Sequence, residues 1–330
     1  MGRPRISRRG WLMGRLLSAL LAFNGIAWMQ AWNLTYYAPA GTMPSRPPEQ
    51  LSLPERAWTI LTGVQVPRPE NTAPLAAGVS AAVPLPYATA RIPLPGGEWL
   101  EVWQQAHPAA QGTVLLFPGY AMSKLSLLHP AAAFYGLGYS VILADYRGVG
   151  GSSGNDTTLG VREGADVAAV VAYAWQAQPD RPILLYGESL GAAAILRAVA
   201  HEGVQPDAIL LQAPFNRLVD TVSNRFTAMG LPAFPAAQTL VFWGSVQQGM
   251  NGFADNPVEY AAAVRCPTLL LHGDRDPRVT VAQTAEIYSA LGGPKTLVRF
   301  PPAGHESLYS ADSARWEAAV HSFLASLPTP

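Results

Sequence analysis

Cysteine is almost absent from this chain, and charged residues are few. The single cysteine, Cys266, excludes an internal disulfide framework and any cysteine-rich metal site. Charged residues make up 13% of the sequence, which is low for a fully soluble protein. The formal net charge is zero, so nothing indicates nucleic acid as a partner. Apolar residues reach 49%, which is ample for a buried core.

The charge is unevenly distributed, because the first fifteen residues hold five arginines and no acid. Residues 16–32 then carry no charge at all, and as a helix they would span about 25 Å, slightly less than a ~30 Å hydrocarbon core. Trp28 and Trp32, with Tyr36 and Tyr37 just beyond, resemble the aromatic cluster of a membrane interface. We therefore expect residues 1–37 to be a basic tip followed by a membrane segment.

Three interpretations of this segment are open. A transmembrane signal anchor with the arginines in the cytoplasm is favoured. A cleaved signal peptide is the alternative, since Ala38-Pro39-Ala40 offers a small-residue cleavage site. An amphipathic helix packed on the body is least favoured, because its arginines would be uncompensated. The first two place the body outside the cytoplasm, either as a single-pass membrane protein or as a secreted or periplasmic one.

Residues 38–86 are rich in proline and are expected to form an extended stalk. Within it, residues 54–63 read as a short helix with proline at its start and glycine at its end.

Residues 87–327 alternate between apolar runs and helical periods, which predicts an α/β domain with a mostly parallel sheet covered by helices on both faces. A β-hairpin is expected around Gly96-Gly97. Further strands are expected at 113–117, 140–145, 183–186, 208–212, 268–272 and 296–300. Helices are expected at 125–135, 161–176, 281–291 and 311–327, with another directly after Gly191.

The interval 213–265 is too long for a simple connection between strands and is expected to be a small helical cap. It is aromatic and apolar, which fits either a lid over an apolar pocket or ordinary packing on the sheet. Its large apolar side chains are Phe215, Phe226, Met229, Phe234, Phe242, Trp243 and Phe253.

The most informative motif is Gly187-Glu188-Ser189-Leu190-Gly191, which lies between a buried strand and an alanine-rich helix. This is the context of a nucleophile elbow, in which a serine sits on a strained strand-to-helix turn. The glycines let strand and helix approach closely, and the helix N-terminus offers N–H donors to an oxyanion. Ser189 is therefore the candidate nucleophile, and an inert tight turn is the alternative.

A serine nucleophile needs a histidine base and an acid, in the chain order serine, acid, histidine. The loop after strand 268–272 offers Asp274 and Asp276, of which Asp276 is favoured because it lies farther into the loop. Asp274 could instead cap the turn or pair with Arg275. His305 follows the last strand and is flanked by Gly304, so it is the candidate base.

The oxyanion hole of such a site uses the N–H after the nucleophile and one N–H from the first strand-to-helix loop. These positions are Leu190 and Tyr120.

These motifs together resemble the α/β-hydrolase superfamily over roughly residues 87–327. They read LLFPGY at 115–120, DYRGVG at 145–150, GESLG at 187–191, LHGDRDP at 271–277 and AGH at 303–305. The chain is most similar to bacterial lysophospholipase-like and serine-aminopeptidase-like hydrolases with an N-terminal membrane segment. The resemblance implies Ser189, Asp276 and His305 as a catalytic triad, with Tyr120 and Leu190 as oxyanion donors. Such proteins usually have His-Gly where this chain has Pro118-Gly119, which leaves the path of that loop open.

The expected function is hydrolysis of a carboxylic ester, of a lipid or of an aryl or alkyl alcohol, through an acyl-enzyme. A thioesterase, a peptidase or amidase with the same triad, and a non-catalytic membrane-tethered binding module of the same fold are the alternatives. The substrate would be a small molecule or a lipid, and nothing in the sequence indicates the oligomeric state.

No cofactor is expected. The glycine-rich run 148–154 resembles a dinucleotide fingerprint, but its third glycine comes one position late. The sequence has no metal-ligand spacing and no phosphate-binding loop.

Overall fold

The computed structural model describes residues 8–46, 50–71 and 87–327. Within these residues, eight strands form one sheet in the order β1-β2-β4-β3-β5-β6-β7-β8. The pairs β1–β2 and β2–β4 are antiparallel, and all other neighbours are parallel. The strands are β1 (Ala88–Pro93), β2 (Trp99–Gln105), β3 (Thr113–Phe117), β4 (Ser140–Ala144), β5 (Ile183–Glu188), β6 (Ala208–Gln212), β7 (Thr268–Gly273) and β8 (Lys295–Phe300).

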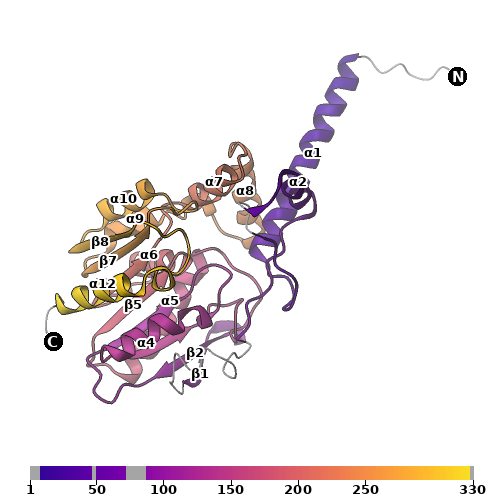
Figure 1. Cartoon of the computed structure of the whole chain (residues 1–330). Helices are drawn as coiled ribbons and strands as arrows, with labels where there is room; N and C mark the ends of the chain where they lie inside the picture. Colours follow the sequence, from indigo (N-terminus) through magenta and orange to yellow (C-terminus); the bar gives the residue numbers. More distant parts are fainter. Residues whose placement is uncertain (1–7, 47–49, 72–86, 328–330) are drawn as a thin grey trace.

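Helices cover both faces of the sheet (Figure 1). Strand side chains alternate between two apolar clusters, so Leu115 and Phe117 face α5, α6 and α10, whereas Val114 and Leu116 face α4 and α12. The α-helices are α1 (Arg8–Thr35), α2 (Leu53–Thr62), α4 (Leu128–Gly136), α5 (Val161–Ala177), α6 (Leu190–His201), α7 (Leu218–Ala228), α8 (Ala236–Gln248), α9 (Pro257–Tyr260), α10 (Val281–Ala290), α11 (Leu308–Ala311) and α12 (Ser313–Ala325). The predicted hairpin and mostly parallel sheet are confirmed.

Two predicted helices differ from those observed. The helix expected over 311–327 is present as α12 and begins only at Ser313, because Asp312 adopts φ −158° and its side chain caps this helix at the N–H of Arg315. A separate short helix, α11, precedes it. The helix expected over 125–135 begins with a 3₁₀ turn, Lys124–Leu127, before α4.

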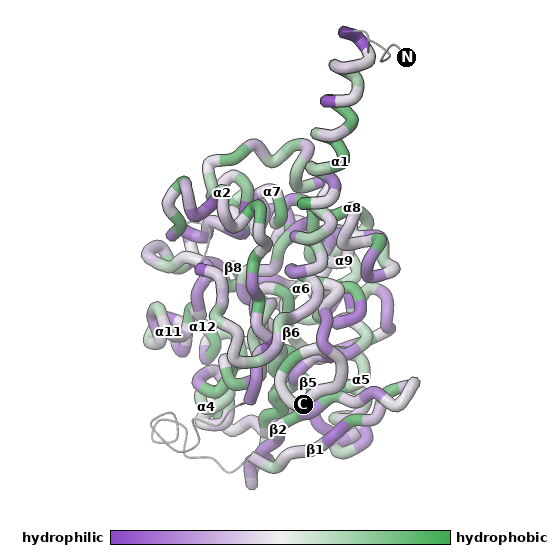
Figure 2. Tube along the Cα trace, turned by 90° about the vertical axis from the view of Figure 1, so that its right-hand side faces the viewer, coloured by the Kyte–Doolittle hydropathy of each residue, from purple (hydrophilic) through white to green (hydrophobic). Residues whose placement is uncertain are grey.

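Helix α1 has two halves in different environments. All residues from 8 to 22 are exposed, and this half projects away from the body (Figure 2). The second half packs on α8, where Trp243 donates a hydrogen bond to Asn24 (3.1 Å) and Gln247 donates one to the carbonyl of Trp28 (2.8 Å). The helix is long and apolar enough to cross a membrane. Its last turns are packed on the body, which was expected only by the interpretation of α1 as an amphipathic helix on the body.

The chain after α1 lies against the body as far as it is described. The N–H of Tyr37 donates to the carbonyl of Asn155 (3.0 Å), and Arg68 donates through Nε to the carbonyl of Gly148 (3.0 Å). The short helix predicted at 54–63 is present as α2. The expected stalk is thus held to the body at described positions such as Arg68 and Asn71, and its residues 47–49 and 72–86 lie outside the described residues. The division into an anchor, a stalk and a catalytic domain stays a prediction.

Helices α7, α8 and α9 fill the interval expected to be a cap, between β6 and β7. Three of its large side chains, Phe234, Phe242 and Phe253, are exposed to solvent. Trp243 contacts α1 through Asn24, as described above. These four aromatic side chains therefore face outward or toward α1, so most of the cap's aromatic surface is turned away from a pocket.

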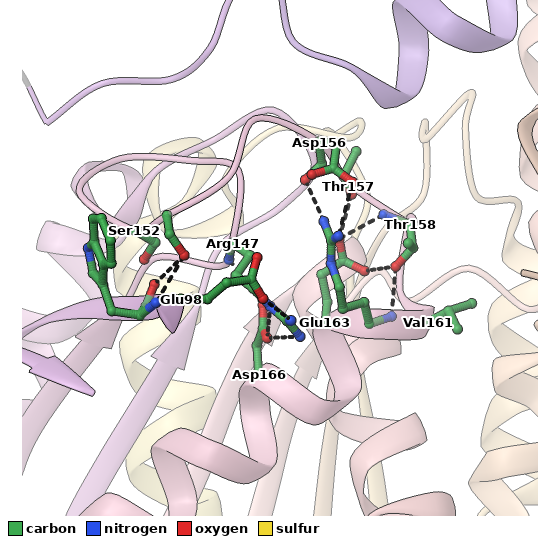
Figure 3. Close-up of polar contacts among 12 residues, drawn as sticks. Glu98, Arg147, Ser152, Asp156, Thr157, Thr158, Val161, Glu163 and Asp166 are labelled. Carbon is green, nitrogen blue, oxygen red and sulfur yellow. Dashed lines mark hydrogen bonds and ion pairs between the residues drawn. The ribbon is translucent and has the colours of Figure 1, made fainter. Parts of the chain in front are cut away.

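Two carboxylates at the start of α5 hold the loop that follows β4. Asp166 accepts hydrogen bonds from Arg147, including one from Nε at 2.8 Å. Glu163 accepts from the hydroxyls of Thr157 (2.6 Å) and Thr158 (2.7 Å) (Figure 3). This loop is fixed at both of its ends.

The glycine-rich run 148–154 is packed against the protein's own carboxylates. A β-carbon on Gly150 would lie 1.9 Å from Oδ2 of Asp145, and one on Gly151 would lie 2.0 Å from Oε1 of Glu101. The N–H of Gly151 donates to Asp145 at 3.0 Å. A dinucleotide phosphate placed here would meet two negative charges, so the glycines serve close packing instead.

Lys124 is completely buried between the same two carboxylates. Its Nζ lies 2.9 Å from Oε1 of Glu101 and also pairs with Asp145. Its backbone N–H donates to Oδ1 of Asp145 at 2.8 Å, and the ring of Trp103 lies 4.7 Å from Nζ. The cluster therefore joins the end of the loop after β3 to β2 and β4.

Replacing Lys124 with methionine is expected to destabilise the protein by about 3–5 kcal/mol, because it leaves the buried Asp145 and the half-buried Glu101 without a counter-charge. Urea unfolding of the variant measures this loss. Arg46→Met is the matched control, since Arg46 pairs with Glu55 at the exposed surface and its loss should hardly move the unfolding midpoint. Equal midpoints for the two variants would contradict the role of the buried cluster.

Candidate active site

Ser189 sits on a sharp turn between β5 and α6. Its backbone adopts φ 51° and ψ −109°, a strained conformation for a residue with a side chain. A β-carbon on Gly187 would lie 2.6 Å from the carbonyl carbon of Gly191, and one on Gly191 would lie 2.4 Å from the carbonyl oxygen of Phe117. Both glycines are therefore required for the close approach of β5, α6 and β3, as the motif predicted.

The structure brings Ser189, His305 and Asp276 together at the carboxyl ends of β5, β8 and β7. The hydroxyl oxygen of Ser189 lies 2.9 Å from Nε2 of His305, and Nδ1 of the same ring lies 2.6 Å from Oδ2 of Asp276. Ser189 and His305 are half-buried, whereas Asp276 is buried. This arrangement can move a proton from the serine to the histidine while the carboxylate holds the ring.

The two candidate acids have different partners. Oδ1 of Asp276 accepts from the N–H groups of Arg278 (2.7 Å) and Val279 (2.9 Å), which fixes the carboxylate and leaves Oδ2 for the histidine. Asp274 instead accepts from Nε of Arg299 at 2.7 Å. Its partner is thus an arginine of β8, and the expected pairing with Arg275 is not the one observed.

Gln212, at the end of β6, fixes the loop that carries His305. Its side-chain N–H donates to the carbonyl of Glu306 (3.3 Å), and its side-chain oxygen accepts from the N–H of Leu308 (3.3 Å). A β-carbon on Gly273 would lie 2.3 Å from the carbonyl oxygen of Gly304, so the acid and histidine loops are in direct contact.

The two predicted oxyanion donors lie beside the serine. Leu190 is the first residue of α6 and directly follows the serine. The loop that contains Tyr120 is also close to the serine, because a β-carbon built on Gly119 would lie 3.7 Å from Cβ of Ser189. Within the described part of the chain, neither the N–H of Leu190 nor that of Tyr120 donates to a protein acceptor. Both are available to a ligand oxygen.

The side chain of Tyr120 links this loop to α1. Its hydroxyl donates to the carbonyl of Leu34 at 2.6 Å, and the guanidinium of Arg225 lies 5.6 Å from the centre of its ring. Burial raises the pKa of the Tyr120 hydroxyl to about 12, so it remains a donor at physiological pH. The last turn of α1 therefore contacts a residue of the candidate oxyanion hole.

Sequence reasoning did not single out Gln212 or Lys124. Gln212 is a buried polar residue at the end of an apolar strand, and this is the signal that could have marked it. Lys124 begins the 3₁₀ turn after the loop and carries no such signal.

The chain is similar to known hydrolases. Residues 108–247 match the family model of serine aminopeptidase S33. A Pyrococcus furiosus esterase, Pf2001, superposes with a TM-score of 0.63 at 21% identity, covering 78% of this chain and 96% of the esterase. The chain therefore has the α/β-hydrolase fold, and part of it matches a hydrolase family.

Two relatives of the hydrolase are informative. The uncharacterized protein YqkD of Bacillus subtilis is 27% identical over 215 residues, which covers 64% of the hydrolase and 70% of YqkD. The lysophosphatidylserine lipase ABHD12 of Macaca fascicularis is 28% identical over 156 residues, covering 46% of the hydrolase and 38% of the lipase. The similarity to this lipase thus extends over less than half of either chain.

Glu188, directly before the nucleophile, is buried, and its carboxylate accepts a hydrogen bond from the hydroxyl of Tyr186 at 2.7 Å. Burial raises the pKa of this carboxyl to about 7, although the hydrogen bond from Tyr186 opposes the shift. In the unfolded chain the pKa of a glutamate is about 4.3. The folded hydrolase therefore holds a proton that the unfolded chain releases between about pH 4.3 and pH 7, and its free energy of unfolding falls over that interval.

Glu188→Gln removes this titration and keeps an acceptor for Tyr186. The free energy of unfolding of the variant, relative to that of the wild type, should rise between pH 5 and pH 7 by an amount on the order of 3 kcal/mol and then level off. Urea unfolding at several pH values measures it. Glu202→Gln, at the exposed end of α6, is the control and should show no such trend. A difference in unfolding free energy between Glu188→Gln and the wild type that does not change with pH would contradict the raised pKa of Glu188.

Proposed function

We propose that the hydrolase cleaves carboxylic esters of lipids through an acyl-enzyme intermediate. The observation that carries the proposal is the chain of contacts from Ser189 through His305 to Asp276, with distances of 2.9 Å and 2.6 Å. In the neutral histidine, Nδ1–H donates to Asp276, which leaves Nε2 free to accept the serine proton.

Each step uses a group at this site. The hydroxyl oxygen of Ser189 attacks the ester carbonyl while Nε2 of His305 takes its proton. The N–H groups of Leu190 and Tyr120 donate to the oxyanion. His305 then gives its proton to the leaving alcohol, and a water molecule, activated by the same nitrogen, hydrolyses the acyl-enzyme.

A lipid substrate is favoured by two observations. The long apolar helix α1 would hold the enzyme at a membrane, and its last turn contacts Tyr120 beside the nucleophile. One relative is a lysophosphatidylserine lipase, which acts on a single-chain phospholipid. A single-chain lysophospholipid is therefore the first substrate to assay.

Ser189→Ala should abolish ester turnover and labelling by a fluorophosphonate probe, with a nearly unchanged melting temperature. Asp276→Asn should lower kcat by about 10⁴, because the histidine ring loses its orienting acceptor. Asp274→Asn is the matched control, since Asp274 pairs with Arg299, and it should retain most activity. Full activity in Asp276→Asn together with loss in Asp274→Asn would overturn the choice of acid. An unlabelled wild-type protein would instead indicate a non-catalytic binding module.

We propose further that α1 is a retained single-pass anchor with the catalytic domain outside the cytoplasm. The arginines before the apolar segment favour a cytoplasmic N-terminus. The contacts of the last turns of α1 with α8 and Tyr120 favour a helix that stays in the mature protein.

The full chain should remain in the membrane pellet after high-salt and alkaline washing, because the protruding half of α1 would be in lipid. A chain beginning at residue 23 keeps the contacts with α8 and should be extracted by the alkaline wash. Sequencing of the mature N-terminus in cells gives the independent check. A protein beginning near Gly41 would show a cleaved signal peptide and would contradict the anchor.

A further inference from the structure

Exposed apolar side chains gather around the point at which α1 leaves the body. The protruding half of α1 carries many of them, as its green colour in Figure 2 shows. Half of the other large exposed apolar side chains in the described residues lie on α2, on α8 or in the loop before α8, close to this point in both views (Figures 1 and 2). They are Leu53, Trp58, Leu61, Phe234, Phe242 and Val246.

Helix α2 is amphipathic, but its apolar side is turned away from the protein. Leu53, Trp58 and Leu61 are 75%, 69% and 61% exposed. The opposite side holds the helix to the body, because Arg56 donates to the carbonyl of Met229 at the end of α7 (2.5 Å). A surface helix normally buries its apolar side, so this orientation needs an apolar environment outside the protein.

Helix α8 shows the same division. Phe242 and Val246, one turn apart, are exposed. The neighbouring Trp243 and Gln247 bind α1 at Asn24 and Trp28. The exposed ridge of α8 therefore lies at the level of residues 24–28 of α1.

The length of α1 places its residues 24–28 at the membrane boundary. The exposed residues 8–22 span about 22 Å as a helix, whereas the hydrocarbon core needs about 30 Å, or about 20 residues. Adjacent Arg8 and Arg9 disfavour an earlier start of the span, whereas Arg15 lies about 10 Å inside it, where a long arginine side chain can still reach the membrane surface. A span that begins there ends near Trp28, whose ring lies 5.9 Å from that of Trp32, and tryptophans are enriched at membrane interfaces. The bilayer boundary then coincides with α8 and with the end of α2, where Gln30 donates to the carbonyl of Thr59 (2.7 Å).

We propose that the exposed apolar sides of α2 and α8, together with Phe234, form one lipid-contacting surface that lies in the membrane interface and holds the cap against the bilayer. This inference rests on the proposed anchoring by α1. A lipid surface is favoured over a second protein copy because the apolar area is continuous with the helix that enters the membrane.

The test uses the full chain in phosphatidylcholine vesicles, with Cys266→Ser as background. Single substitutions Leu61→Cys, Phe242→Cys and Trp175→Cys each receive an environment-sensitive fluorophore. Trp175 is the matched control, because it is an exposed aromatic residue on α5, away from the protruding half of α1 (Figures 1 and 2). Fluorescence at 61 and 242 should shift to the blue and be quenched by nitroxides carried near the top of the lipid acyl chains, and fluorescence at 175 should do neither.

Two results would overturn the proposal. If the protein sediments with vesicles but shows no quenching at positions 61 and 242, the proposed anchor stands and the proposed lipid-contacting surface is contradicted. If the protein does not sediment with vesicles, both the anchor and the lipid-contacting surface are contradicted. Quenching does not depend on turnover, so a failed catalytic assignment is recognised separately by the fluorophosphonate probe.

An activity measurement provides the second readout. The double variant Leu61→Glu/Phe242→Glu should lose turnover of a lysophospholipid presented in vesicles and keep turnover of soluble p-nitrophenyl butyrate, which also reports that it is folded. Trp175→Glu should retain both activities. Equal turnover of the vesicle substrate by wild type and double variant would contradict the role of the surface.

Discussion

The close backbone contact among β3, β5 and α6 is the constraint on which the site depends. Ser189 can stand above the sheet with φ 51° only because the helix N-terminus passes directly over the end of β5. That passage leaves no space for a β-carbon at Gly187 or Gly191. The same contact brings the first turn of α6 and the loop after β3 together, so that the nucleophile and both candidate oxyanion donors occupy one edge of the sheet. Strain at one residue is thus maintained by the packing of three elements.

Buried polar residues hold the loops around this edge. Lys124 and its two carboxylates hold the loop after β3, whereas Gln212 holds the loop that carries His305. The carbonyl of Gln212 also accepts from the backbone N–H of Ser189 at 2.8 Å, whereas Lys124, within the described residues, has no hydrogen bond to the serine. Both residues act by restricting the backbone that presents a reacting group or a donor. Buried charges and amides are costly unless they are fully paired, which is consistent with the several partners that each one has.

The N-terminal helix and the catalytic body are joined more closely than an anchor and a passenger domain need to be. Asn24 and Trp28 bind α8, and the carbonyl of Leu34 accepts from Tyr120 in the loop beside the nucleophile. Anchoring, the cap and the candidate oxyanion hole therefore share one set of contacts. For an enzyme of membrane lipids, this arrangement would place the reacting groups close to the surface from which the substrate comes.

The sequence by itself determined the strands, most helices, the elbow and the order of Ser189, Asp276 and His305, because these follow from local periodicity and from turn residues such as Gly187 and Gly191. Only the tertiary structure decided the contacts between distant segments. It paired Asp274 with Arg299, divided α1 into a protruding and a packed half, and turned the apolar side of α2 outward. The hydrogen bond between Trp243 and Asn24 joins positions 219 residues apart. No local pattern encodes such a pair, because which faces meet depends on how the whole chain closes around its sheet.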